Sequence, residues 1–385
     1  MKKGLMITWL SAIALSLALS SCKDETVSEI TLNNQAIGER SGSPYEAPGA
    51  IYLIDNDANA NRVMRFDRSY DGSLSNKQAW LTGGLGTGGG LGSQGAVIRY
   101  RNYLLVVNAG SNEISVFRVF GSSLMLTDVE PSQGIMPVSL TASRNLVYVL
   151  NAGGDGNIAG FSLNSQGGLD FIPGSAQPLS SSAAGGAQIA FDFSGRTLVV
   201  TEKATNTISV YSTINPNGVA GPPTTYQSAG NTPFGFDFGR ANMLFVSEAF
   251  GGAAGASTLS SYRLNPSGNL ELIDGPVATL QTAACWAVVS NDGKYTYTTN
   301  TGSASVTGFS ISPSGYLELL DESGVSGTTG AGPIDAGFSP ASNFLYTLNA
   351  GSDSITMFAV DDDGSLTNIG EWEGLPDGAA GLAVD

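Results

Sequence analysis

The chain has 385 residues, with 33 acidic and 17 basic side chains, a formal net charge of −16 and no histidine. A surface this acidic repels phosphate backbones and anionic membranes, which excludes nucleic acid as a partner. The absence of imidazole excludes Ser-His-Asp and Cys-His nucleophiles as well as histidine-ligated zinc.

The first 21 residues have the pattern of a secretory signal peptide. Lys2 and Lys3 precede an apolar stretch over 5–19, which is followed by small residues and Cys22. The stretch has 15 residues, fewer than the roughly 20 that a helix needs to cross a bilayer. We therefore expect cleavage after residue 21. Cleavage removes both lysines and leaves a net charge of −18.

Cys22 is the predicted site of lipid attachment. The run Leu-Ser-Ser-Cys at 19–22 resembles the bacterial lipobox, in which the cysteine is acylated and becomes the first mature residue. The following Lys-Asp-Glu at 23–25 resembles the surface-export signal of Bacteroidetes lipoproteins, although a plain charged tether would look the same. We expect a cell-envelope lipoprotein of the outer membrane, attached to the membrane through the lipid on Cys22, with surface exposure as the finer expectation.

Residues 22–48 are polar and irregular and predict the lipidated cysteine followed by a flexible tether. From Gly49 onward the chain repeats a β-rich run, a small polar turn and a second β-rich run. Two clear copies are YLLVVNAGSNEISVFRV at 103–119 and LVYVLNAGGDGNIAGFSL at 146–163. Aromatic residues that close the second run recur every 44 to 51 residues, at Phe66, Phe117, Phe161, Tyr211, Tyr262, Phe309 and Phe358. One four-stranded propeller blade needs about this many residues.

The two ends of the repeat region complement each other. The first unit lacks an inner strand, while the chain ends in LPDGAAGLAVD, which has the pattern of a lone inner strand. Pairing these two segments removes a free sheet edge. We therefore predict an all-β fold for residues 49–385: a seven-bladed β-propeller of four-stranded blades, with blade 1 closed by the C-terminal strand.

The repeat units resemble a known family. N-A-G-S-x-x-I-x-x-F at 108–117 and 349–358, turns of the type NPSG and SPSG, and proline-led inner strands resemble the lactonase-like seven-bladed propellers, which include 6-phosphogluconolactonase and carboxymuconate cyclase. YVLNAGG and LYTLNAGS also resemble surface-layer propeller repeats of the YVTN type. The resemblance implies the fold, and function has to be argued from the site.

The family motif often carries a histidine two residues after the inner-strand proline, facing the channel. This pattern falls on positions without histidine: Ser139, Gln188, Gly235, Trp286 and Asp335. The departure argues against the family's lactone hydrolysis. We nevertheless expect Ser139, Gln188 and Trp286 to contact a ligand, with Trp286 either stacking on a ring or filling the core.

A second set of polar residues precedes the turn inside each unit and is expected to form one ring on the same face. It comprises Asn108, Asn151, Glu202, Asn300 and Asn349, with Glu248 added if 251–256 is an insertion. Asparagine at such a position usually caps its own turn, which is the alternative to ligand contact at Asn108, Asn300 and Asn349.

The carboxylates are the candidate catalytic groups. A lactone hydrolase without histidine must activate water with a carboxylate or a metal, and Glu202, Glu248 and Asp335 are the predicted acids or bases. Lys203 and Arg99 are candidates to stabilise an oxyanion. The alternative for the carboxylates is an ordinary solvated charge in an acidic protein.

Two other features are interpreted structurally. Cys285 lies in the apolar run Ala-Ala-Cys-Trp-Ala and is expected to be a buried hydrophobe rather than a nucleophile. The oxygen-rich run 55–61 lacks the glycine and glutamate of an EF-hand, so we expect a polar turn. We therefore predict no metal and no cofactor.

Two functions remain open on the sequence. The first is an envelope-anchored binding or scaffold module for a glycan, a peptide or a partner protein. The second is a divergent hydrolase or isomerase that acts on an unphosphorylated lactone through carboxylates of the channel face. A phosphorylated lactone suits neither an exported location nor a net charge of −18.

Overall fold

The computed structural model describes residues 45–212 and 214–385. The predicted signal peptide, Cys22 and tether residues 22–44 lie outside the described residues. Within them, no helix is long and apolar enough to cross a membrane. The regular elements are 30 strands and two short 3₁₀ helices, η1 (Arg240–Asn242) and η2 (Phe250–Gly252).

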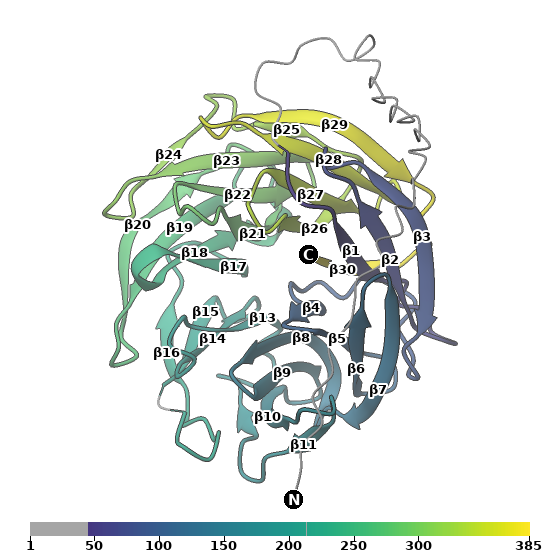
Figure 1. The fold of residues 1–385 in the computed structure, drawn as a ribbon. Helices are drawn as coiled ribbons and strands as arrows, with labels where there is room; N and C mark the ends of the chain where they lie inside the picture. The colour runs from purple at the N-terminus through teal and green to yellow at the C-terminus, as the bar shows by residue number, and fades with distance from the viewer. Residues whose placement is uncertain (1–44, 213) are drawn as a thin grey trace, which may run out of the picture. The chain divides into compact units, whose positions relative to one another are not determined.

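The strands form seven antiparallel sheets arranged in a ring around a central axis (Figure 1). From the axis outward, blade 1 comprises β30 (Ala380–Val384), β1 (Gly49–Ile54), β2 (Arg62–Arg68) and β3 (Leu74–Leu81). Blade 2 comprises β4 (Val97–Tyr100), β5 (Tyr103–Asn108), β6 (Glu113–Phe120) and β7 (Ser123–Pro131). Blade 3 comprises β8 (Ile135–Ser143), β9 (Leu146–Gly153), β10 (Asn157–Leu163) and the outer segments β11 (Leu169–Phe171) and β12 (Gln177–Pro178).

The remaining blades repeat this order. Blade 4 comprises β13 (Gly186–Phe191), β14 (Leu198–Glu202), β15 (Thr207–Tyr211) and β16 (Thr224–Gln227). Blade 5 comprises β17 (Pro233–Gly239), β18 (Met243–Glu248), β19 (Thr258–Leu264) and β20 (Leu270–Ala278). Blade 6 comprises β21 (Ala284–Val289), β22 (Tyr295–Asn300), β23 (Ser305–Ile311) and the outer segments β24 (Leu317–Leu319) and β25 (Gly327–Thr328). Blade 7 comprises β26 (Pro333–Phe338), β27 (Phe344–Asn349), β28 (Ser354–Val360) and β29 (Leu366–Glu373).

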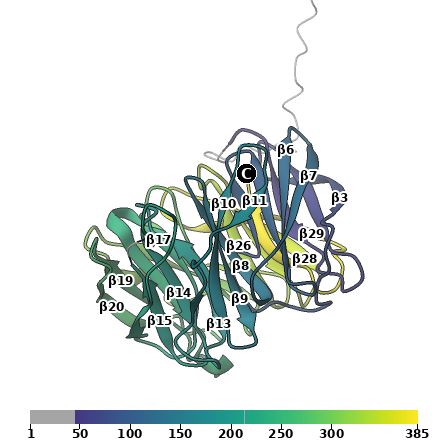
Figure 2. The same cartoon turned by 90° about the horizontal axis from the view of Figure 1, so that it is seen from below.

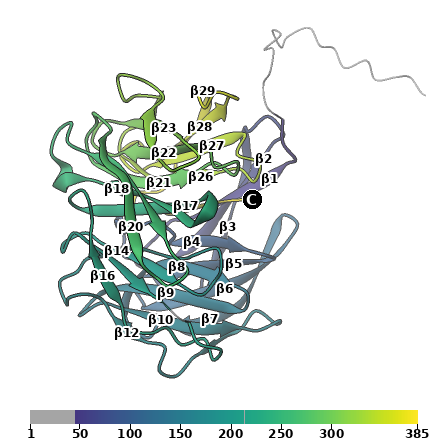
Figure 3. The same ribbon diagram turned by 90° about the vertical axis from the view of Figure 1, so that its left-hand side faces the viewer.

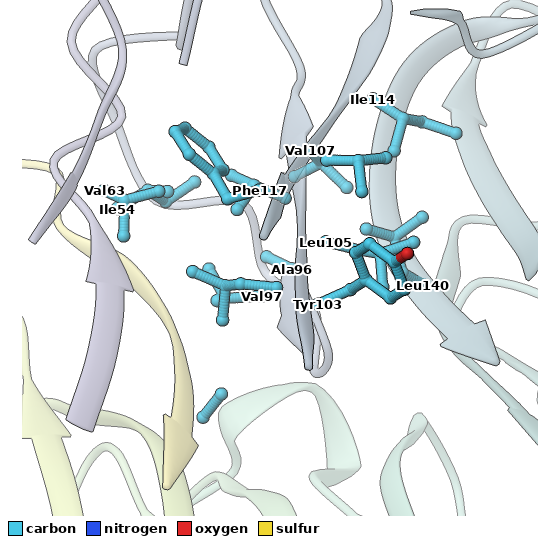
Figure 4. Packing of buried hydrophobic residues seen from close by; sticks show 14 of the residues in the cluster. Ile54, Val63, Ala96, Val97, Tyr103, Leu105, Val107, Ile114, Phe117 and Leu140 are labelled. Atoms are coloured by element: carbon cyan, nitrogen blue, oxygen red, sulfur yellow. The ribbon is translucent and has the colours of Figure 1, made fainter. Parts of the chain in front are cut away.

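Burial follows the position of a strand in its blade. All six residues of β5 are buried, because a middle strand is covered on both faces by the neighbouring blades. The outer strand β3 is exposed or half-buried along its whole length. The views in Figures 2 and 3 show the sheets packing face to face around the ring. Apolar side chains from adjacent blades fill the space between the sheets, as Ile54, Val97, Leu105, Phe117 and Leu140 do in Figure 4.

The ring closes as predicted. β30 pairs with β1, with Ile51 opposite Val384 and Tyr52 opposite Ala383. Each inner strand also contacts the inner strands of both neighbouring blades, from β4 around to β30. The all-β class, the seven blades and the completion of blade 1 by the C-terminal strand are therefore confirmed.

Candidate functional site

The inner strands carry a repeated irregularity at the position where the family motif places histidine. The register shifts between Pro137 and Ser139, and again immediately before Gln188, Trp286 and Asp335. In β17 the same shift encloses Gly235. A β-bulge redirects the side chain that follows it. The family motif therefore placed these five residues at equivalent points of the inner strands.

Two of these side chains connect neighbouring inner strands. The amide of Gln188 donates to the Phe236 carbonyl at 2.9 Å and accepts from the Phe236 N–H at 2.6 Å. Ser139 Oγ accepts from the Ile189 N–H at 3.1 Å. An inner strand has one unpaired edge, and its backbone groups need partners. Both side chains supply such partners to the next blade.

A glycine-rich segment, residues 83–95, crosses the channel mouth and is called the strap below. It connects β3 of blade 1 to β4 of blade 2. The amide of Gln94 donates to the Ala287 carbonyl at 2.9 Å and accepts from the Ala287 N–H at 3.2 Å, on the inner strand of blade 6. The Gln94 N–H donates to the Ala187 carbonyl of blade 4 at 3.2 Å. The strap therefore links the connection between blades 1 and 2 to blades 4 and 6 across the ring.

Lys203 and Trp286 lie against the strap. Trp286 Nε1 donates to the Ser93 carbonyl at 2.9 Å, and Trp286 is 3% exposed. Lys203 Nζ donates to the Gly92 carbonyl and lies 4.7 Å from the centre of the Phe234 ring. Burial lowers the pKa of Lys203. The two predicted ligand-contacting residues thus bind consecutive carbonyls of the chain itself.

The polar ring predicted at the ends of the second strands is present in the expected register. Asn108, Glu202, Glu248, Asn300 and Asn349 are the last residues of β5, β14, β18, β22 and β27, and Asn151 lies near the end of β9. Glu248 pairs with Thr258, ten positions on, whereas Asn349 pairs with Ser354. Residues 249–257 therefore form the longer loop of the set.

Three asparagines of this ring donate to a hydroxyl of their own blade. Asn108 Nδ2 donates to Ser115 Oγ at 2.7 Å, and Asn349 Nδ2 donates to Thr356 Oγ1 at 2.8 Å. Asn300 Nδ2 donates in the same way to Thr307 Oγ1 at 2.9 Å. Each bond joins the second strand to the third, and all three asparagines are fully buried.

The two glutamates of the ring have full sets of donors. Glu202 accepts from the Ser180 N–H at 3.1 Å, from Ser209 Oγ at 2.7 Å, and from the hydroxyls of Ser180 and Thr205. Glu248 accepts from the Gly230 N–H at 2.9 Å and from three hydroxyls, those of Ser228, Thr258 and Ser260. Both residues are 0% exposed, and burial raises the pKa of Glu248.

Asp335 is the predicted carboxylate that lies beside the channel. It lines a cavity of about 360 Å³ together with Gln94, Arg99, Thr141 and Gln188. Its Oδ1 accepts from the Ala336 N–H at 2.9 Å, while Oδ2 is buried without a hydrogen-bond partner. Burial raises the pKa of Asp335 well above that of an ordinary carboxyl group. Arg99 pairs with the side chain of Asp385, with Nε 3.1 Å from Oδ2.

The remaining predicted features have structural contacts. Asp55 accepts from the Arg62 N–H at 2.8 Å and forms an ion pair with the Arg62 guanidinium, so the oxygen-rich run folds into a turn. Cys285 is a buried free cysteine, and burial raises the pKa of its thiol to about 11. Among residues 45–212 and 214–385, no group of three or more metal-ligating acidic or thiol side chains is present.

Sequence reasoning missed the strap and Asp237. Asp237 of β17 accepts from the N–H groups of Phe238 and Val289 at 2.8 and 2.9 Å, and burial raises its pKa to about 6. A signal for the strap was available, because residues 83–95 contain eight glycines and the isolated Leu91. Such a run is too long for a simple turn between strands, and Leu91 is buried.

One family model matches part of the chain. Residues 258–373, from β19 to β29, match the model described as lactonase, seven-bladed beta-propeller. The family resemblance that the repeat units suggested is thereby confirmed. No curated protein matches the sequence.

Solved structures match over nearly the whole domain. A candidate 6-phosphogluconolactonase of Bacteroides fragilis has 19% identity and a TM-score of 0.65, with coverage of 90% of this chain and 99% of that one. A periplasmic gluconolactonase of Pseudomonas aeruginosa has 17% identity and a TM-score of 0.68, with coverage of 87% and 99%. At these identities the likeness shows the fold alone. Residues 258–373 are thus identified as lactonase-type propeller sequence, within a domain that has the seven-bladed fold of the lactonase-like proteins from its first blade to its last.

Proposed function

We propose that the protein is an envelope-anchored lactonase-like propeller that binds a glycan, a peptide or a partner protein rather than turning over a lactone. The observation that carries this proposal is the strap across the channel mouth. Its carbonyls accept hydrogen bonds from Lys203 and Trp286, and the Gln94 side chain donates to the backbone of β21. The end of the channel that would receive a substrate is therefore filled by the chain itself.

The contacts of the glutamates favour the same proposal. A general base must come within hydrogen-bond reach of the water that it activates. Glu202 and Glu248 are 0% exposed, and each already accepts from four donors. Either carboxylate would have to leave a saturated site before it could reach a substrate.

A divergent hydrolase or isomerase that acts on an unphosphorylated lactone is the second candidate. Its support is the family match over 258–373 and the gluconolactonase name of a structural neighbour. Asp335 would be its base, because it lines the channel cavity and has a carboxylate oxygen without a partner. A phosphorylated substrate is disfavoured by the net charge of −18 expected after export.

Hydrolysis of neutral lactones separates the two candidates. We expect no turnover of gluconolactone, galactonolactone or an acyl homoserine lactone above the rate in buffer, measured by pH-stat titration. Glycans and peptides screened by thermal shift are expected to yield a ligand. Turnover that falls at least a hundredfold in Asp335→Asn but not in Glu248→Gln would overturn the binding proposal and assign the base to Asp335.

The envelope anchor is tested separately in cells. Metabolic labelling with an alkyne-modified palmitate is expected to label the wild-type chain and to leave Cys22→Ser unlabelled, because the thiol of Cys22 carries the lipid. Protease treatment of intact cells is expected to degrade the propeller domain. Complete protection of the domain, with cleavage only after the cells are lysed, would place it on the periplasmic side of the outer membrane.

A further inference from the structure

We propose that the strap is a built-in occupant of a ligand site at the channel mouth, and that the site beneath it binds a small carboxylate. The site comprises the Lys203 ammonium, the Trp286 indole N–H and the Phe234 ring. This inference rests on the proposed binding function and names the class of ligand. The donors, the charge and the attachment of the strap each support it.

The two donors of the site both bond to carbonyl oxygens of the strap. Lys203 Nζ and Trp286 Nε1 bind the carbonyls of two consecutive residues, Gly92 and Ser93. The Phe234 and Trp286 rings lie 4.9 Å apart and form an apolar wall beside these donors. A carboxylate has two oxygen acceptors, one for each of the two donors, when the strap is displaced.

The charge of the site favours an anion over another carbonyl. None of the ion pairs within residues 45–212 and 214–385 involves Lys203. Its ammonium is held instead by one neutral carbonyl and one aromatic ring. A carboxylate adds to the hydrogen bond a charge–charge attraction with the ammonium, which a neutral carbonyl lacks. A carboxylate thus has an advantage over the carbonyl that now occupies the site.

The strap has glycines within and on both sides of the residues that fill the site. Gly89 and Gly90 have open space where a side chain would lie, and Gly92 and Gly95 have φ values of +59° and +85°. Such backbone conformations suit glycine and few other residues. The Gln94 side chain ties the strap to Ala287 through two hydrogen bonds, and Ser93 Oγ donates to the Val138 carbonyl at 2.8 Å. Loss of the two Gln94 bonds should loosen the strap and leave the blades unchanged.

Hydrogen exchange and calorimetry on the full chain carrying Cys22→Ser test the proposal. Removal of two hydrogen bonds in Gln94→Ala is expected to raise the exchange rate of strap amides about tenfold or more. The variant should also bind benzoate about tenfold more tightly, because the loosened strap competes less with benzoate for the site. Benzamide, which has the same shape without the charge, should bind to neither protein.

Matched variants assign the binding to the site. Lys203→Met and Trp286→Phe in the Gln94→Ala background should weaken benzoate binding at least tenfold, while Lys294→Met, on an exposed lysine, and Gln166→Ala, on an exposed glutamine, should change nothing. Strap exchange unchanged in Gln94→Ala, or equal binding of benzoate and benzamide, would overturn the proposal. Lactone turnover that appears only in Gln94→Ala would overturn the proposed binding function, but it would still support the strap as the occupant of the site.

Discussion

Deletion of residues 379–385 is expected to leave no folded monomer. This segment contains β30, the inner strand of blade 1, and its loss exposes the edge of β1 along the channel. Ala50 and Asp385 exchange backbone hydrogen bonds of 3.2 and 2.8 Å, and Arg99 of blade 2 pairs with the Asp385 side chain. The deletion therefore removes the inner strand of blade 1 and the ion pair that this strand's end forms with blade 2.

The expected loss approaches the free energy of unfolding of a typical domain. Burial of Leu382, which is 8% exposed, contributes about 2 kcal/mol. The hydrogen bonds of the strand add about 1 kcal/mol each. A total above about 5 kcal/mol approaches the whole free energy of unfolding of an ordinary domain. Size-exclusion chromatography should show aggregate, and the near-ultraviolet circular dichroism of the native protein should be lost.

A control deletion and a peptide make this result specific. Removal of Ala253, Ala254 and Gly255, which are exposed in the loop between β18 and β19, is expected to leave the domain folded. A synthetic peptide of residues 377–385 added during refolding should restore part of the monomer by pairing with β1. A monomer of the truncated chain that unfolds at the same urea concentration as the wild type would show that ring closure does not depend on β30.

The repeat of the sequence was sufficient to predict the fold, because a propeller repeats its strands at a fixed period. The aromatic markers, the turns with glycine and the unmatched terminal strand defined the blades and the closure without any tertiary information. The same register placed Ser139, Gln188, Trp286 and Asp335 at equivalent points of the inner strands. Position relative to the repeat was thus predictable for most candidate residues.

The surroundings of those residues were not predictable in the same way. Gln94 bonds to Ala287, 193 positions away, and Gln94 lies outside the repeated units. The strap is an insertion between blades 1 and 2, so no other unit of the chain indicates where it lies. Whether a glutamate is free or saturated depends on serines and threonines of adjacent strands and loops, such as Ser228 and Ser260 around Glu248. Periodicity identifies a position, but it carries no information on these contacts between strands.

Glu248→Ala is expected to destabilise the domain by about 3 to 5 kcal/mol, although Glu248 was a candidate catalytic residue. The substitution leaves the Gly230 N–H and the hydroxyls of Ser228, Thr258 and Ser260 without their acceptor in a buried site. Each unsatisfied donor carries a penalty of about 1 kcal/mol or more, and the cavity adds to it. Glu248→Gln should cost less than about 1 kcal/mol, since hydroxyls can turn to accept from its amide.

The raised pKa of Glu248 predicts how the stability difference between the wild type and Glu248→Gln changes with pH. Burial raises the pKa of Glu248 in the folded protein above its unfolded value of 4.5. The folded state therefore keeps a proton that the unfolded state has lost, so the contribution of Glu248 to stability is largest below about pH 4.5 and declines as the pH rises. Glu248→Gln has no proton to lose, and its stability relative to the wild type should increase between pH 4 and pH 7.

Urea unfolding of the wild type, Glu248→Ala and Glu248→Gln at pH 4 and pH 7 measures both effects. Glu318→Ala, on an exposed residue of β24, serves as the control and should change the free energy of unfolding by less than about 0.5 kcal/mol. Equal stability of the Ala and Gln variants would show that the four donors do not depend on Glu248. A difference between wild type and Glu248→Gln that stays constant with pH would show that this carboxyl has the same pKa folded and unfolded. The expected pattern would instead explain why a glutamate is used at a position that most blades fill with asparagine: its two oxygens satisfy four donors, which joins the segment before β17 to β19.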